Sequence, residues 1–163
     1  MEYIYTSKLQ LKMNTEFDIL RKSRALFLKE LEGLTLAQLH TIPTGFINHI
    51  AWNVAHVLVT QQLLHYQLSE LNCLCPDDLI ETHKKGTSPT VTFSEEEFEE
   101  VKDLFAGLPD TLQEDYEAEI FQNYTEYPTS TGFVIHSIEE AIAFNNFHEG
   151  IHYGIVRAIK KFV

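Results

Sequence analysis

Apolar residues recur at helical spacing in four long stretches of this chain. In the first stretch the repeating positions are Phe17, Leu20, Leu28 and Leu31. Asn14 is suited to cap a helix start, because its side chain can accept from the free first-turn amides, and Gly33 is suited to end it. Residues 1–13 alternate only partly, which fits an edge strand, an extended arm or a helix extension. We treat them as an N-terminal extension of a domain over residues 14–163.

The second stretch shows a heptad pattern that is typical of the inward line of a bundle helix. Its positions are His49, Trp52, His56, Val59, Leu63 and Tyr66. Asn48 is the predicted cap, and the pattern fades around residues 69–72. Two histidines therefore occupy positions where apolar core residues are expected.

Residues 73–93 contain prolines, a glycine and many polar residues, which predicts a long loop. Ser94 to Glu97 then form a capping box that opens a third helix. Pro109 is expected to kink that helix or to restart it. Because the loop before it is long, the third helix need not run antiparallel to the second.

A second capping box, Ser137 to Glu140, opens a fourth helix that is expected to run almost to Val163. Its inward line reads Ala141, Asn145, His148, His152, Ile155 and Ile159. Four helices with little strand predict an all-α protein, a four-helix bundle.

The composition fits one globular domain, and the net charge argues against two classes of binding partner. The chain has 163 residues, 44% hydrophobic residues and a net charge of −12. Nucleic acid and anionic membranes bind basic patches, so neither is an expected partner. The N-terminus lacks the layout of a signal peptide and no apolar run is long enough to span a bilayer, so we expect a cytoplasmic protein. Cys73 and Cys75 are expected to be free thiols rather than part of a disulfide framework.

The histidines of the two inward lines predict a metal site. His148 and His152 are four residues apart, which places both rings on one face of a helix. Facing bundle helices lie roughly 8–10 Å apart, so His56 can complete the set. His49 is about 10 Å further along the axis and is not expected to share the ion. Asn53 and Asn145 are candidates for orienting a ring or a substrate oxygen.

A plainer interpretation is that these histidines are hydrogen-bonded core residues. The other histidines are expected on the surface or in loops: His40, His65, His83 and His136. Trp52, Phe144 and Phe147 are expected in the core rather than around a ligand.

The segment from His148 to His152 also matches H-E-x-x-H, a zinc protease motif in which the glutamate is the general base. After His152 the chain offers no further ligand, since Ile155 and Ala158 replace the Gly and His of the extended motif. Glu149 is expected to point about 100° away from the histidine line, so we do not assign it as a base.

Two longer motifs resemble those of the DinB-like superfamily, which includes YfiT-type metal-dependent hydrolases. They are Asn48 to His56 (NHIAWNVAH) and His148 to Ile155 (HEGIHYGI), the latter preceded by a Ser-Ile-Glu-Glu-Ala helix opening. The resemblance implies an up-down-down-up bundle with His56, His148 and His152 as ligands of nickel or zinc. It also implies a homodimer in many cases, and in some relatives a thiol S-transferase activity on low-molecular-weight thiols.

We therefore expect a metal-dependent enzyme, a thiol S-transferase or hydrolase, that acts on a small-molecule substrate. A non-catalytic metal-binding bundle and a plain helical interaction protein are the alternatives.

Overall fold

The computed structural model describes residues 2–163, with side chains described from residue 11 onward. Four long helices form most of this part of the chain: α1 (Glu2–Leu31), α3 (Ile50–His65), α5 (Glu95–Glu117) and α6 (Ile138–Ile159). The shorter elements are α2 (Leu36–Leu39), η1 (Gln67–Ser69), α4 (Asp77–His83), β1 (Tyr127–Pro128), β2 (Val134–Ile135) and η2 (Lys160–Phe162).

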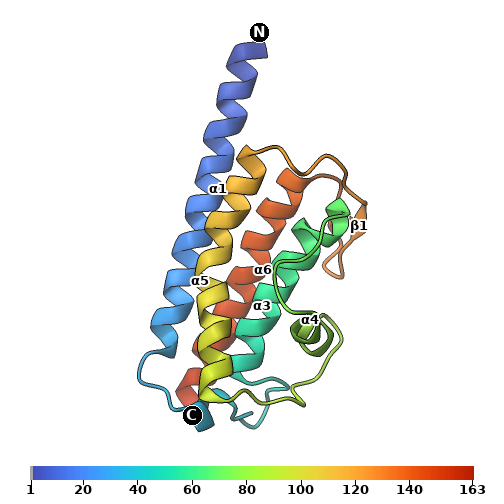
Figure 1. The fold of residues 1–163 in the computed structure, drawn as a ribbon. Coiled ribbons are helices and arrows are strands. Elements are labelled where there is room, and N and C mark those ends of the chain that lie inside the picture. Colours follow the sequence, from blue (N-terminus) through green and yellow to red (C-terminus); the bar gives the residue numbers. More distant parts are fainter. Residues whose placement is uncertain (1) are drawn as a thin grey trace.

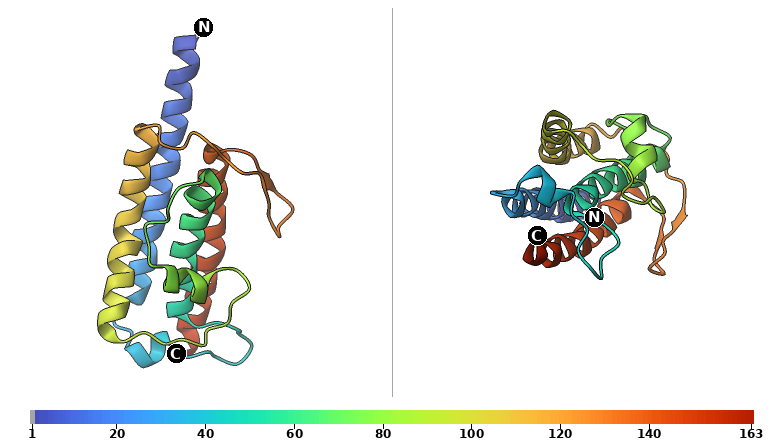
Figure 2. Two further views of the ribbon diagram at one scale, coloured as in Figure 1. Left: turned by 45° about the vertical axis from the view of Figure 1, so that its right-hand side comes forward. Right: turned by 90° about the horizontal axis from the view of Figure 1, so that it is seen from below.

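The four long helices form a bundle with the predicted up-down-down-up order. Helices α1 and α6 run in one direction, and α3 and α5 run in the other (Figure 1). Each helix has two neighbours, because α1 and α3 both pack against α5 and α6. The first turns of α1 extend beyond the ends of the other helices (Figures 1 and 2). The parallel pair α3 and α5 explains why a long crossover joins them.

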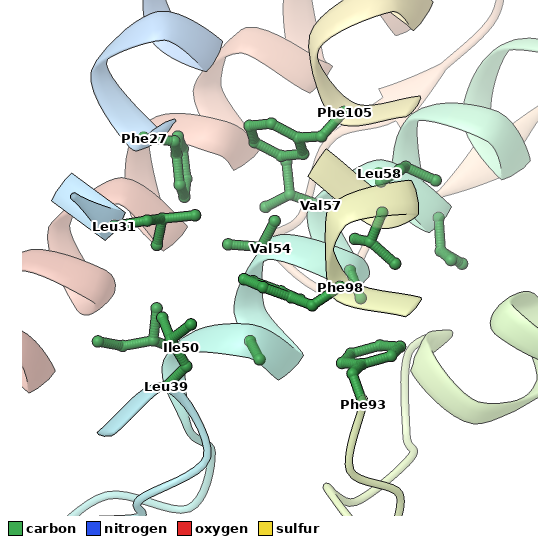
Figure 3. Packing of buried hydrophobic residues seen from close by; sticks show 14 of the residues in the cluster. Phe27, Leu31, Leu39, Ile50, Val54, Val57, Leu58, Phe93, Phe98 and Phe105 are labelled. Carbon is green, nitrogen blue, oxygen red and sulfur yellow. The ribbon is translucent and has the colours of Figure 1, made fainter. Parts of the chain in front are cut away.

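The main hydrophobic core lies between the four long helices, toward the end of the bundle where α1 and α6 end and α3 and α5 begin. Figure 3 shows Phe27 of α1, Val54 of α3 and Phe98 of α5 among its side chains. Helix α3 is buried on nearly all sides, and only Thr60 and Leu63 are partly exposed. Its outer side is covered by α4, which packs against it. The heptad line predicted for this helix is therefore only part of its buried surface.

Arg24 of α1 sits at the centre of the bundle and contacts the other three long helices. Its guanidinium donates to both carboxylate oxygens of Glu149 on α6, at 2.7–3.0 Å. It also donates to Gln61 Oε1 on α3 and to the Phe105 carbonyl on α5, each at 3.0 Å. Asn145 Nδ2 donates to Glu149 Oε1 at 2.9 Å. Arg24 and Glu149 are 1% and 0% exposed, so this ion pair is held inside the core.

Pro109 lies inside α5, which continues through it as one helix. The helix is therefore not restarted at this proline. Proline has no amide hydrogen, so in a helix the carbonyl four residues earlier loses its donor. That carbonyl belongs to Phe105, and Arg24 Nη1 donates to it. The arginine thus satisfies the backbone acceptor that the proline leaves free, and α5 runs on to Glu117.

Two predicted helix starts are wrong. Asn14 does not cap α1, which runs from Glu2 through this position. Of the three options for the N-terminal extension, the helix extension is confirmed over residues 2–13, and residue 1 lies outside the described residues. Helix α3 is capped by His49 rather than Asn48, because His49 Nδ1 accepts from the Trp52 amide at 2.9 Å. A neutral histidine can act here like the usual Asn or Ser. Gly33, at φ 77°, follows the end of α1 as predicted.

The segments predicted as loops contain short structured elements. Helix α4 lies within residues 73–93, where the sequence predicted only a loop, and no side chain caps its start. Strand β1 lies in the connection between α5 and α6. It pairs antiparallel with β2 in a small hairpin, with Tyr127 opposite Ile135. Ser137 accepts from the Glu140 amide, but the Glu140 carboxylate binds the His136 amide, so only half of the second capping box forms.

Burial of His65 makes the stability of the fold sensitive to pH. Desolvation lowers the pKa of this fully buried side chain to about 3. The unfolded chain takes up this proton near pH 6.5, whereas the folded chain resists it until about pH 3. His65 therefore causes no change in the free energy of unfolding above pH 6.5. Between pH 6.5 and about pH 3 its contribution falls as the pH drops, by up to about 1.4 kcal/mol per pH unit.

We expect the free energy of urea unfolding of His65→Gln to change less between pH 7 and pH 5 than that of the wild type. His136→Ala is the matched control, because His136 is exposed, and it should keep the wild-type slope. Equal slopes in all three proteins would contradict a neutral buried His65.

Candidate metal centre

Three histidines from two helices meet on one side of the bundle. His56 comes from α3, and His148 and His152 come from α6. One ring nitrogen from each lies within 4.8 Å of the others. The ring centroids of His148 and His152 are 4.5 Å apart, and that of His56 is 4.8 Å from His152 and 5.3 Å from His148. The structure therefore brings together the three residues that the sequence singled out, and this cluster could bind a metal.

Neighbouring acceptors fix the tautomers of two of the rings. His56 Nδ1 lies 2.7 Å from the carbonyl oxygen of His83 at the end of α4. His152 Nδ1 lies 2.8 Å from Asn53 Oδ1. Because both oxygens can only accept, each Nδ1 carries the hydrogen and each Nε2 keeps its lone pair. At His56 the Thr60 hydroxyl lies 3.4 Å from this Nε2. Such an acceptor behind the ring is the usual partner of a metal-ligating histidine.

Asn53 is held so that its oxygen faces His152. The side chain is fully buried, and its Nδ2 donates to the His49 carbonyl at 2.8 Å. Trp52 stacks on His56, with ring planes 8° apart and centroids 4.6 Å apart. Two of the three rings are thus fixed by packing or hydrogen bonds before any ligand binds.

His148 has a buried nitrogen that the protein leaves without a partner. No side chain or backbone group in the described part of the chain hydrogen-bonds to its Nδ1. A buried polar atom of this kind is costly unless something binds nearby. Together with the two fixed tautomers, it makes the donor set compatible with a metal ion.

All three rings are neutral at physiological pH. Burial is the main cause, and it lowers the pKa of His56 and brings those of His148 and His152 to about 3. Nearby histidines add to the effect for the two residues of α6, and Arg24 adds to it for His148. Only a neutral imidazole can donate a lone pair to a metal, so the burial prepares the cluster for binding.

A cavity of about 540 Å³ opens onto the three histidines. Its walls come from α3, α6, the end of α4 and the β1–β2 hairpin. Apolar side chains form one side, among them Leu63, Phe144 and Phe147, while Lys84 and Lys85 lie on another part of the lining. This size is in the range of small-molecule pockets. The cluster is therefore accessible to a ligand and is not a closed structural site.

A family model described as the DinB superfamily matches residues 19–156. This covers most of the chain, including all three histidines. The chain belongs to the DinB superfamily. A comparison with curated proteins gives no match.

The DinB assignment and the position of Glu149 both count against the protease interpretation. Glu149 is not among the residues that line the cavity, and its carboxylate is bound by Arg24 on the core side of α6. Among the residues that the structure describes, no aspartate or glutamate lines this cavity. Glu149 therefore points away from the histidines, as the helical rotation predicted, and its role in this DinB protein is structural.

Several expectations about the neighbouring residues need correction. Asn145 does not contact the histidine cluster, since its amide binds Glu149 instead. His49 is buried as a helix cap and lies outside the cluster, as predicted. Phe147 is 48% exposed and is not a core residue. Phe144 is partly buried and packs against the core, as predicted, but both side chains also line the cavity. Trp52 is buried, as predicted.

The predicted surface location is right for His136 and wrong for two other histidines. His136 is exposed and pairs with Glu126 at 3.0 Å, while His40 is half-buried. His65 and His83 are buried, and the His83 ring stacks on Phe93. His83 also supplies the acceptor for His56, a role that its position in a polar segment gave no reason to expect.

Cys73 and Cys75 are free thiols, as expected. Burial raises the pKa of Cys73, and it raises that of Cys75 to about 12. Both are therefore protonated and poorly suited to act as nucleophiles. No helix in the described part of this DinB protein is long and apolar enough to cross a membrane.

Proposed function

We propose that this DinB protein binds one divalent metal ion, nickel or zinc, through His56, His148 and His152. We further propose that it is a metal-dependent enzyme, a thiol S-transferase or a hydrolase with a small-molecule substrate. The observation that carries the proposal is the convergence of three neutral imidazoles at the wall of an open cavity. Three protein ligands leave a coordination position open, which is typical of catalytic sites.

Different residues would hold the ion and orient its ligands. His56, His148 and His152 would hold it, while His83 and Asn53 keep two of the rings in the correct tautomer. When bound, the ion would supply Lewis-acid chemistry that makes a water molecule or a thiol more acidic. The apolar lining would limit the access of bulk water, and it would orient the substrate beside the histidines.

The proposal is tested with protein loaded separately with zinc and nickel. We expect about one ion per chain by elemental analysis, and transfer or hydrolysis activity in a screen of small thiols, electrophiles and esters. Removing the ion with a chelator should abolish the activity, and adding the ion back should restore it. Activity that survives metal removal would overturn the proposed mechanism. Full metal content without activity in the screen would instead favour the non-catalytic metal-binding bundle.

The hydrogen bond from His152 to Asn53 gives a second, finer prediction. Replacing Asn53 by leucine removes the acceptor, and the zinc affinity is expected to fall by about 10–100-fold. Asn53→Asp keeps an acceptor oxygen and should restore most of that affinity. The affinity is measured by competition with a chromophoric chelator.

Asn145→Leu is the matched control, because Asn145 is equally buried but contacts Glu149 and not the histidines. It should alter the unfolding midpoint and leave the zinc affinity unchanged. If Asn53→Leu and Asn145→Leu weaken zinc binding equally, Asn53 has no specific role at the site.

A further inference from the structure

The cavity beside the histidines has an unusual charge for this protein. The chain carries 24 acidic and 12 basic residues. Among the described residues that line the cavity, the charged side chains are those of Lys84 and Lys85, and no carboxylate is found. A strongly acidic protein thus places two lysines in the wall of the cavity where a ligand would bind. A local charge opposite to the net charge is expected where an anion is recognised.

Lys84 and Lys85 follow His83 in the chain, and the His83 backbone contacts one of the three histidines of the cluster. His83, whose carbonyl accepts from His56, directly precedes them. The Lys84 amide donates to Ile80 O at 2.9 Å, and its carbonyl accepts from the Thr87 hydroxyl at 2.8 Å. Since the segment that holds His56 also carries the lysines, their backbone positions are fixed relative to the histidines.

The charges of both lysines are available to a ligand. Lys84 Nζ lies 2.6 Å from Glu81 Oε2, but the two side chains are 42% and 67% exposed, and such a pair contributes little. Lys85 forms no ion pair with any described residue. An anion in the cavity can therefore recruit either ammonium group without breaking a strong interaction.

Another part of the cavity lining is apolar and partly exposed. Phe144 and Phe147 of α6 contact Phe133 of the hairpin, with centroid distances of 5.8–5.9 Å among the three rings. Ile151, one turn beyond Phe147, is 42% exposed and also lines the cavity. Exposed apolar surface next to a pocket marks a place where apolar ligand atoms bind.

We infer that the substrate of this site is an anionic amphipathic small molecule. Its anionic group, a carboxylate or a phosphate, binds Lys84 and Lys85, and its apolar part lies on Phe144, Phe147 and Ile151. The reacting atoms then lie between these two regions, beside the histidines. This inference rests on the proposed function, and it adds the chemical class of the substrate.

The test uses three probes: hexanoate, the neutral hexanamide, and acetate, which lacks the apolar chain. Binding is measured by ligand-observed NMR on metal-free and on zinc-loaded protein. Hexanoate should bind about tenfold more tightly than either hexanamide or acetate, since each lacks one of the two recognised parts. Added salt should weaken hexanoate binding and leave hexanamide binding unchanged.

The variant Lys84→Gln/Lys85→Gln should bind hexanoate about tenfold more weakly than wild type and hexanamide equally well. The matched control is Lys22→Gln/Lys102→Gln, which changes the net charge equally. Lys102 forms an ion pair with Glu99 three residues away, like Lys84 with Glu81, but does not line the cavity. The control should bind all probes as the wild type does.

Outcomes for the inference and for the proposed function are separable. Lysine variants that keep full zinc content and lose only the preference for hexanoate support the inference. The inference is overturned if the wild type binds hexanoate no more tightly than hexanamide. It is also overturned if hexanoate is preferred only in the presence of zinc and the lysine variant keeps that preference, because the carboxylate then binds the ion. Absence of zinc binding in the wild type overturns the proposed function, whatever the probes show.

Discussion

Arg24→Met is expected to lower the free energy of unfolding by about 3–5 kcal/mol, because it leaves the Glu149 carboxylate buried without its cation. The same change removes the donor to Phe105 O, the carbonyl that Pro109 leaves unpaired. A domain of this size is usually stable by about 5–15 kcal/mol, so the loss is a large part of the total. Urea unfolding followed by circular dichroism measures it.

Two further variants separate burial from charge. Arg21→Met, one turn earlier on α1, breaks a partly exposed ion pair with Asp110 and should change the stability by about 1 kcal/mol or less. Arg24→Met/Glu149→Met removes both charges and should be more stable than Arg24→Met alone, since no uncompensated charge remains. Equal losses for Arg21→Met and Arg24→Met would contradict the role given to the buried pair.

His56→Ala and His148→Ala have the largest expected effect on the proposed site. Apparent binding energies of about 10–16 kcal/mol for four-ligand zinc sites correspond to about 3 kcal/mol per ligand, so each change should weaken zinc binding on the order of 100-fold. Elemental analysis after dialysis should then show chains almost free of metal. Full metal content in both variants would exclude the three-histidine site.

His49→Ala tests the choice between the two histidines at the start and middle of α3. It removes a helix cap, which should lower the stability by about 0.5–2 kcal/mol, and it should leave the zinc content at the wild-type level. His136→Ala, on the exposed hairpin side, should change neither quantity.

The histidine cluster was predictable because it follows from helical periodicity. His148 and His152 at a spacing of four must share a face, and His56 falls on the inward line of another long helix. The contact with Asn53 was foreseen only as one of two candidates, since spacing alone cannot distinguish Asn53 from Asn145. Their hydrogen-bond partners, His152 and Glu149, depend on how α3 and α6 are rotated against each other.

The rest depended on contacts between distant segments. The spacing of Phe17, Leu20, Leu28 and Leu31 puts Arg24 on the same helix face, but its charge predicts a surface position. Only the pairing with Glu149 and the acceptor freed by Pro109 make a buried arginine favourable. Helix α4 is short, polar and without a side-chain cap, so its position against α3 sets its structure more than its own pattern does. Burial of His83 follows from the same contact, whereas His65 is buried beside Ala141 of α6.

The histidine cluster and the rest of the cavity lining stand on different kinds of element and should differ in how well they tolerate substitution. The three histidines stand on bundle helices, where a change disturbs the core, whereas Lys84, Lys85 and the hydroxyl residues Thr129 to Thr131 stand on connections that border the same cavity. Connections tolerate substitution, insertion and deletion better than the helices they join. The ligand preference of the cavity can therefore evolve, or be engineered, by exchanging these two connections while the three histidines and the bundle stay as they are.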